Sequence, residues 1–178
     1  KVDEEYICKN VFIGKTDVSG MTKEEAVKAV DNTLGDYRNK QLVLKVKDQG
    51  ADVSIEEMGA EVENIDKLAE KAVGYGKNGS IWSRYQKIHN LNKKKYVIDE
   101  SFKVDEAKLR ELIQERAVPL EQKAVNASAS YNGSGFDLTD EAEGYTVDVD
   151  KSVKKIKNFM NKKWNYEDAE VELKLDTE

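Results

Sequence analysis

The sequence predicts an α+β fold made of two related strand-turn-strand-helix units, each an antiparallel sheet with packed helices. Its apolar residues alternate with polar ones in some segments and recur every three or four positions in others, which is typical of strands and amphipathic helices respectively. A chain of 178 residues is long enough to bury a core in two small units. In addition, "GADVSIEEMGAEV" from Gly50 and "GFDLTDEAEGYTV" from Gly135 align without a gap at an offset of 85 residues. This repeated phrase indicates a duplicated element.

The first unit is expected over residues 1–90 and begins with a short strand at "VFIG", followed by a helix. Thr22 and Glu25 have the spacing of a capping box, in which each side chain satisfies a backbone N–H at the helix start. Gly35 is the expected end of this helix. One apolar stripe along it is formed by Ala26, Val27, Val30 and Leu34.

A strand and the first copy of the repeated phrase complete this unit. In "QLVLKVK" the apolar residues alternate with polar ones, as in a half-buried antiparallel strand; they are Leu42, Leu44 and Val46. The repeated phrase then supplies a second strand and a tight turn that Ser54 caps and Gly59 ends. A helix follows, with Leu68, Ala72 and Val73 on its apolar side.

The second unit is expected over residues 91–178. "KVDEAKLRELIQERAV" predicts a helix that Pro119 stops, and "AVNASASYNG" returns as a strand. After the second copy of the phrase, with Thr139 and Gly144 at its turn, comes the clearest amphipathic helix, with lysines on its other face. Its apolar side consists of Val153, Ile156, Met160 and Trp164. "AEVELKL" closes the unit as a strand, and the segment "YGKNGSIWSRYQKIHNLNKKKYVIDESF" forms the joint between the two units.

Composition and charge exclude several functions. The formal net charge of −6, with lysines interleaved among acids, provides no positive field for a nucleic acid backbone. One cysteine, Cys8, and one histidine, His89, leave no basis for a cysteine or histidine metal centre or a triad, so no metal and no cofactor are expected. No stretch is apolar enough to span a membrane, so no membrane contact is expected. The chain opens at Lys1 within a charged phrase and reads as part of a longer protein.

Three motifs suggest chemistry, but each has a simpler structural interpretation. "SVKK" from Ser152 matches the S-x-x-K pattern of penicillin-interacting enzymes but lacks its partner motifs and falls on a helix. "DVDKS" from Asp148 begins like a calcium loop but lacks its glycine and final glutamate; loose coordination by Asp148 and Asp150 stays open. A glycosidase pair could be formed by two acids among Asp137, Glu141, Asp148 and Asp150, yet acids occur at equivalent places in the first unit. No catalytic residue is therefore assigned.

The joint contains the best ligand-binding candidates. Tyr75, Trp82, Arg84 and Tyr85 lie within eleven residues, and aromatic faces can stack on sugar rings while an arginine can hold a carboxylate. Alternatively, Trp82 and Tyr85 pack the two units together and Arg84 pairs with a nearby acid.

Three phrases resemble a known family. They are "VFIGKTDVSGMTKEEAVKAV" at 11–30, "AVGYGKNGSIWSRY" at 72–85 and "NGSGFDLTDEAEGYTVDVDKSVKKI" at 132–156. In this order they resemble the peptidoglycan-binding domain found upstream of L,D-transpeptidase domains and in VanW-type proteins of Gram-positive bacteria. The resemblance supplies no set of ligand-contacting residues.

The resemblance implies a non-catalytic extracytoplasmic module tethered by an upstream membrane segment. Such a module would bind peptidoglycan weakly, through glycan or stem peptide, or position a linked cell-wall enzyme domain. Two alternatives stay open. One is a spacer or interaction domain that recruits another envelope protein, and the other is a hydrolase acting on wall glycan.

Overall fold

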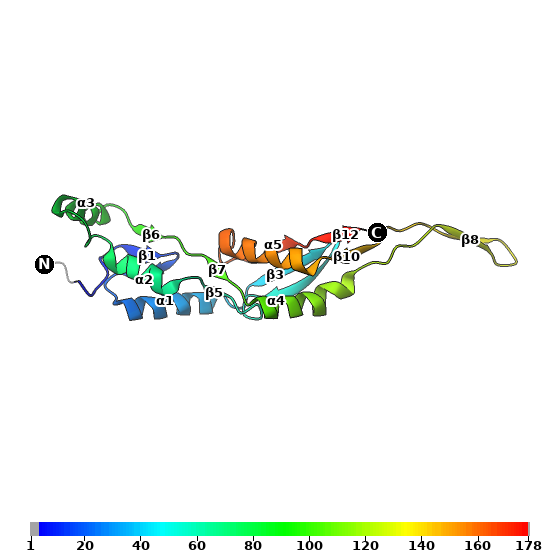
Figure 1. Ribbon diagram of the computed structural model, residues 1–178, viewed down its shortest axis with the longest axis horizontal. Coiled ribbons are helices and arrows are strands. Elements are labelled where there is room, and N and C mark those ends of the chain that lie inside the picture. The colour runs from blue at the N-terminus through cyan, green and yellow to red at the C-terminus, as the bar shows by residue number, and fades with distance from the viewer. Residues whose placement is uncertain (1–3, 178) are drawn as a thin grey trace. The chain divides into compact units, whose positions relative to one another are not determined.

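The computed structural model describes residues 4–177 and shows an α+β fold (Figure 1). The helices are α1 (Lys23–Asp36), α2 (Ile65–Gly74), α3 (Ile81–Leu91), α4 (Glu106–Leu112), a π-helical segment η1 (Ile113–Ala117), a 3₁₀ turn η2 (Val118–Leu120) and α5 (Val149–Lys162). The strands are β1 (Val11–Ile13), β2 (Thr16–Asp17), β3 (Gln41–Val46), β4 (Gln49–Ser54), β5 (Glu61–Val62), β6 (Tyr96–Ile98), β7 (Phe102–Lys103), β8 (Ser128–Tyr131), β9 (Phe136–Thr139), β10 (Tyr145–Val147), β11 (Ala169–Glu172) and β12 (Leu175–Thr177).

The described chain divides into two compact units that interleave along the sequence. Unit 1 consists of residues 4–38 and 60–103, and unit 2 consists of residues 39–59 and 104–177. Each unit therefore contains two separate segments of the chain. The chain passes from unit 1 to unit 2 after residue 38, returns to unit 1 after residue 59 and enters unit 2 again after residue 103. This division differs from the sequential halves 1–90 and 91–178, because residues 39–59 leave the first half and fold with the second.

Unit 1 is built on a parallel strand pair. β1 pairs in parallel with β6 and antiparallel with β2, while β5 and β7 form a separate antiparallel pair. Helix α1 packs on α2 and β5, and α2 packs on β1. The predicted capping box is confirmed, since Thr22 Oγ1 accepts from the backbone N–H of Glu25 and the Glu25 carboxylate accepts from that of Thr22.

Unit 2 repeats this arrangement with different segments. β3 pairs in parallel with β11 and antiparallel with β4, while β10 and β12 form an antiparallel pair. Helix α4 packs on α5, and η1 packs on β3 and β4. The predicted α+β class is confirmed. The predicted antiparallel sheet of each unit is mixed, because a strand distant in the sequence adds in parallel.

The buried residues agree with most of the predicted stripes. Fully or nearly fully buried are Ala26, Val30, Leu34, Leu42, Leu44, Val46, Val53, Val153, Ile156 and Met160. Trp164 is also buried, although α5 ends at Lys162. In α2, Ala69 and Ala72 are buried, whereas Leu68 and Val73 are only half-buried.

Three predicted boundaries were wrong. Gly35 lies inside the last turn of α1, and Tyr37 caps the helix by donating to the Leu34 and Gly35 carbonyls. Pro119 lies within η2, since the helix is extended past Leu112 by π-helical and 3₁₀ turns that accommodate a proline at the start of the last turn. The "AEVELKL" strand is divided into β11 and β12.

Candidate functional site

Helix α3 of unit 1 carries an exposed aromatic stripe. Ser80 caps the helix, its Oγ accepting from the backbone N–H of Ser83 at 3.2 Å. Trp82 and Tyr85 are 68% and 60% exposed, and their ring centroids lie 6.1 Å apart in a stacked orientation. Tyr85 stacks in turn on His89, with centroids 5.9 Å apart. Spacings of three and four residues place these three rings on one side of the helix.

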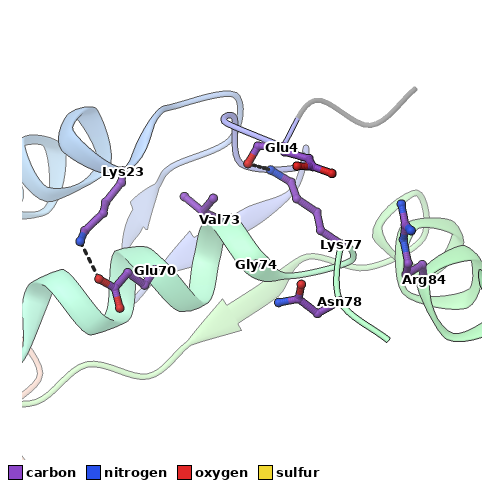
Figure 2. A pocket seen from close by; sticks show the side chains of 8 residues that line it. All are labelled: Glu4, Lys23, Glu70, Val73, Gly74, Lys77, Asn78 and Arg84. Atoms are coloured by element: carbon purple, nitrogen blue, oxygen red, sulfur yellow. Dashed lines mark hydrogen bonds and ion pairs between the residues drawn. The ribbon is translucent and has the colours of Figure 1, made fainter. Parts of the chain in front are cut away.

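A hollow of about 380 Å³ lies beside α3 in the same unit (Figure 2). Two of its cations have partners within the protein. Lys23 forms a 2.6 Å ion pair with Glu70, and the Lys77 ammonium donates to the backbone carbonyls of Glu4 and Tyr6. The pairing raises the pKa of Lys23 and lowers that of Glu70. The hollow is lined by Glu4, Lys23, Glu70, Val73, Gly74, Lys77, Asn78 and Arg84.

Arg84 is the cation in this hollow that stays available. Arg84 as a whole residue is half-buried, and within residues 4–177 no hydrogen bond or ion pair is found for its guanidinium. Arg84 follows Trp82 by two residues, so its side chain leaves the helix about 200° around from that of Trp82. The arginine and the aromatic stripe therefore occupy different sides of α3.

Tyr75 lies apart from both Arg84 and the aromatic stripe. It caps α2 and stacks on Tyr96 with a centroid separation of 3.7 Å, while Lys87 Nζ lies 5.8 Å from its ring. Burial raises the pKa of the Tyr75 hydroxyl. Tyr75 and Tyr96 help to line a second hollow of about 480 Å³ next to Leu91.

Of the four residues predicted from the sequence, the structure thus brings together Trp82 and Tyr85 but separates Arg84 and Tyr75 from them. His89 also belongs to the stripe and was not among the predicted residues. Its position seven residues after Trp82 is a helical spacing that could have revealed it. The rings of Trp82 and Tyr85 are both solvent-exposed.

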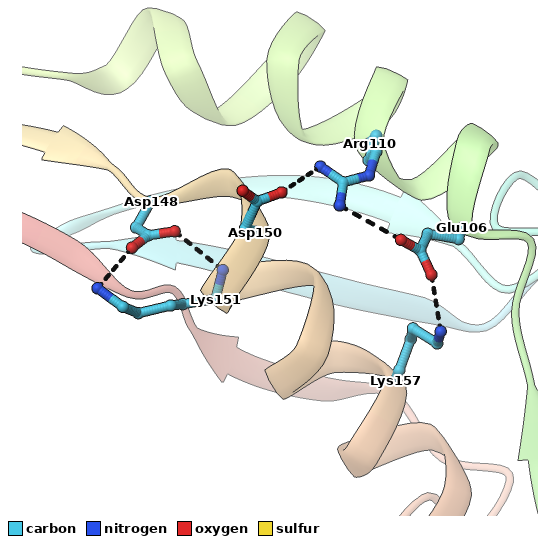
Figure 3. Close-up of polar contacts among 6 residues, drawn as sticks. All are labelled: Glu106, Arg110, Asp148, Asp150, Lys151 and Lys157. Carbon is cyan, nitrogen blue, oxygen red and sulfur yellow. Dashed lines mark hydrogen bonds and ion pairs between the residues drawn. The ribbon is translucent and has the colours of Figure 1, made fainter.

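The acidic residues of the calcium-like phrase are engaged in ion pairs in unit 2 (Figure 3). Asp148 caps α5 and pairs with Lys151 at 2.7 Å, which lowers the pKa of the Asp148 carboxyl. Asp150 pairs with Arg110 at 2.6 Å. Glu106 accepts from both Arg110 and Lys157, and its pKa is lowered, with Lys157 as the larger cause. Within residues 4–177, no group of three or more metal-ligating side chains is found.

The other motifs have structural surroundings. Ser152, of the S-x-x-K pattern, is fully buried, and its Oγ accepts from the backbone N–H of Lys174 at 3.0 Å, which links α5 to the segment between β11 and β12. Asp137 and Glu141 are exposed, and Asp137 accepts from the Asn132 side-chain amide at 2.9 Å. Neither acid is among the residues that line the hollows described above.

Of the helices within residues 4–177, none combines the length and apolar character that a membrane span requires.

Comparison with known proteins identifies the family. No curated protein and no solved structure matches the chain significantly. The model of the family described as "Putative peptidoglycan binding domain" matches residues 51–169, about two thirds of the chain. The matched region includes the aromatic stripe, Arg84 and helix α5. The chain therefore belongs to this peptidoglycan-binding domain family.

Proposed function

We propose that this protein is a non-catalytic cell-wall module that binds peptidoglycan through α3, with the aromatic stripe of Trp82, Tyr85 and His89 as the glycan contact. The observation that supports this most directly is the exposure of two stacked aromatic rings on a helix of a domain whose family description names peptidoglycan binding. Exposed apolar rings are costly to keep in water, and sugar rings present apolar faces that can cover them.

The strength of this contact can be bounded. An aromatic stacking interaction contributes about 0.5–1.5 kcal/mol beyond the area that it buries. Since 1.4 kcal/mol corresponds to a tenfold change in Kd, removing one ring should weaken binding about tenfold. Two rings and one cation predict weak binding, which is useful when many modules act on a polymeric wall.

Arg84 provides a second contact with different chemistry. A guanidinium without a protein partner can form a bidentate ion pair with a carboxylate, such as that of a muramic acid lactyl group or a stem peptide. Because Arg84 and Trp82 leave opposite sides of a helix about 10 Å across, one sugar ring cannot contact both. The ligand that uses both contacts is therefore a glycan bearing a peptide, which can reach around the helix.

The cellular setting follows from this ligand. We propose that the module lies outside the cytoplasmic membrane, as part of a membrane-anchored envelope protein, and holds a linked enzyme domain of the L,D-transpeptidase or VanW type near its substrate. A spacer role for the same linked domain, without ligand binding, is the alternative that the experiment below separates from it.

Soluble muropeptides titrated into ¹⁵N-labelled protein test the proposal. Resonances of residues 81–89 should shift at millimolar ligand, and Trp82→Ala should raise Kd about tenfold. Arg84→Gln should weaken binding of muropeptides that carry a free carboxylate but leave unchanged the binding of a peptide-free glycan whose lactyl carboxyl groups have been reduced to alcohols. Arg84→Lys should restore part of the loss, because lysine keeps the charge but not the fork.

Phe136→Ala is the matched control, because it removes an equally exposed ring far along the chain from α3. This variant should bind sacculi as the unsubstituted protein does. If no α3 resonance moves and the protein does not sediment with purified sacculi, binding is excluded and the spacer role stands. Equal losses in Phe136→Ala and Trp82→Ala would show that binding is not located on α3.

A further inference from the structure

Two hairpins occupy equivalent places in the order of the secondary-structure elements. β3–β4 lies between α1 and β5, and β8–β9 lies between η2, which extends α4, and β10. Both precede an element pair of the same kind, β5–α2 and β10–α5. The repeated phrase aligns β4 with β9 and β5 with β10. The two hairpins are thus corresponding parts of the internal repeat.

The first of these hairpins is donated to the next unit. Residues 39–59 follow α1 of unit 1 in sequence but fold with unit 2. There β3 pairs in parallel with β11, and η1 packs on β3 and β4. Arg116 of η1 secures this packing by donating to the Asp52 carbonyl at 2.8 Å and to the Glu57 carboxylate. The apolar face of the hairpin is consequently buried, through Leu42, Leu44, Val46 and Val53.

The second hairpin, β8–β9, is also amphipathic, but within residues 4–177 no helix packs on its apolar face. Its register pairs Ala129 with Leu138 and Tyr131 with Phe136, which places these four side chains on one face. The opposite face carries Ser128, Ser130, Asp137 and Thr139. Tyr131, Phe136 and Leu138 are 66%, 71% and 76% exposed, with the two rings 5.5 Å apart. In Figure 1 the hairpin stands clear of the other strands and helices of unit 2.

The hairpin is the end of a longer ribbon with one continuous register. Paired backbone hydrogen bonds join Gln122 to Tyr145 and Val125 to Ala142, in line with the pairing of β8 and β9. Within residues 4–177, β8 and β9 pair only with each other, so both strands keep a free edge. A free-standing two-stranded hairpin is marginally stable in water, and an exposed apolar face on it indicates an absent partner.

We propose that β8–β9 is a donor hairpin that completes a further unit of this same fold, one whose own hairpin place is vacant. β8 adds in parallel to a strand equivalent to β11, and the apolar face is covered by a helix equivalent to α4–η1. The partner is an α+β unit, since this is the environment that buries β3–β4. Another copy of the described chain does not offer such a place, because β1–β2 occupies it in unit 1 and β3–β4 occupies it in unit 2.

An extended chain tests the proposal directly. In this extended chain, residues 1–177 are followed by a second copy of residues 105–177. Strand β12 then leads directly into the added copy of α4, just as β7 leads into α4 in the original chain. The pairing of Val62 with Phe102 and of Val147 with Leu175 justifies this junction. The added copy carries Phe136→Ser and Leu138→Asp, which distinguish its hairpin peptides by mass and remove their apolar face.

Hydrogen exchange should then separate the two hairpins. Amides of residues 128–139 in the native hairpin should exchange at least about 100-fold more slowly in the extended chain than in the unextended chain, since docking protects exposed strands. The altered hairpin of the added copy should exchange rapidly. Peptides from residues 149–162, which occur in both copies, should show a single protected population.

The control moves Phe136→Ser and Leu138→Asp from the added copy to the native hairpin. The added unit should then unfold, and peptides from residues 149–162 should show a second, unprotected population. The proposal is overturned if the native hairpin still exchanges rapidly, if the added unit stays unfolded beside an unsubstituted hairpin, or if the control leaves it folded. A dimer of the unextended chain that Leu138→Asp abolishes in sedimentation equilibrium would instead assign this face to a second copy. Sacculus binding through α3 is measured separately, so the two proposals can fail independently.

Discussion

The hairpins β3–β4 and β8–β9 are copies of one element in two environments. β3–β4 contributes four buried apolar side chains to unit 2, whereas the corresponding face of β8–β9 is exposed. Both hairpins are amphipathic, although β3 and β4 have six residues each and β8 and β9 have four each. In the part of the chain that the structure describes, only β3–β4 has a parallel strand beside it and a helical segment over it. The burial of its apolar face therefore depends on contacts with distant segments of unit 2.

Backbone exchange should show the largest difference between the two hairpins. Amides of Leu42 and Leu44 should be protected to nearly the full free energy of unfolding, because their strand lies between two partners. Amides of β8 and β9 should be protected about tenfold at most. Hydrogen exchange followed by mass spectrometry measures both in one sample. Equal protection would mean that β8–β9 is stable by itself and would remove the basis of the comparison.

Leucine truncation should give the next largest effect. Leu44→Ala should lower the free energy of unfolding by about 2–5 kcal/mol, because the fully buried side chain leaves a cavity. Leu138→Ala should change it by less than about 0.5 kcal/mol, since the removed atoms are mostly solvated. Urea denaturation measures both. A loss above 1 kcal/mol for Leu138→Ala would indicate that the hairpin packs against its own unit in solution.

The glycines that begin the repeated phrase offer a matched pair of substitutions. A Cβ added at Gly50 would lie 2.6 Å from Val43 Cγ1, whereas one added at Gly135 would meet nothing within 4 Å. Gly50→Ala should therefore cost about 1–2 kcal/mol through crowding, and Gly135→Ala should be near neutral. Thermal unfolding of the two variants checks this, and equal shifts in Tm would contradict it.

The smallest effect concerns the ion pair that secures β3–β4 to η1. Arg116 lowers the pKa of Glu57 from 4.5 to about 2, while the corresponding position in the second copy is Ala142. A carboxyl whose pKa is lower in the folded state stabilises the fold above pH 4.5, and this contribution is lost as the pH falls toward 2. Glu57→Gln should cost about 1 kcal/mol or less at pH 7, because the pair is partly solvated, and nothing near pH 2.

Denaturation of Glu57→Gln and the unsubstituted protein at a series of pH values tests this. The two stability curves should converge below pH 4.5. Parallel curves would show that the Glu57 carboxylate does not contribute through its charge.

Local elements were largely predictable from the sequence, and their partners were not. The capping box of Thr22 and Glu25 and the buried stripe of Val153, Ile156 and Met160 depend on neighbours within one helix. The parallel pairing of Leu44 with Val171 joins residues more than a hundred positions apart, and no periodicity reveals it. The two glycines that were expected to end equivalent turns also differ. Gly59 adopts a left-handed conformation, whereas Gly144 allows the backbone of Ala124 to approach.

The candidate site shows the same division. Trp82 and Tyr85 were grouped only because they are close in the sequence. Helix α3, which was not predicted, brings their rings together because three residues separate them. Tyr75 and Arg84 were grouped with them by closeness in sequence, but helix α3 directs Arg84 to another side and Tyr96 holds Tyr75 by stacking. Closeness along the chain is therefore a poor guide where a helix rotates each residue by about 100°.

The α+β class, the duplicated element and the amphipathic faces could be predicted without a structure, because they follow from spacing within short segments. The unit that each hairpin joins and the apolar face that is left in water became visible only in the folded chain. Covering a face requires contacts between segments far apart in the chain. Two copies of one sequence pattern can therefore differ, with the apolar face buried in one copy and exposed in the other.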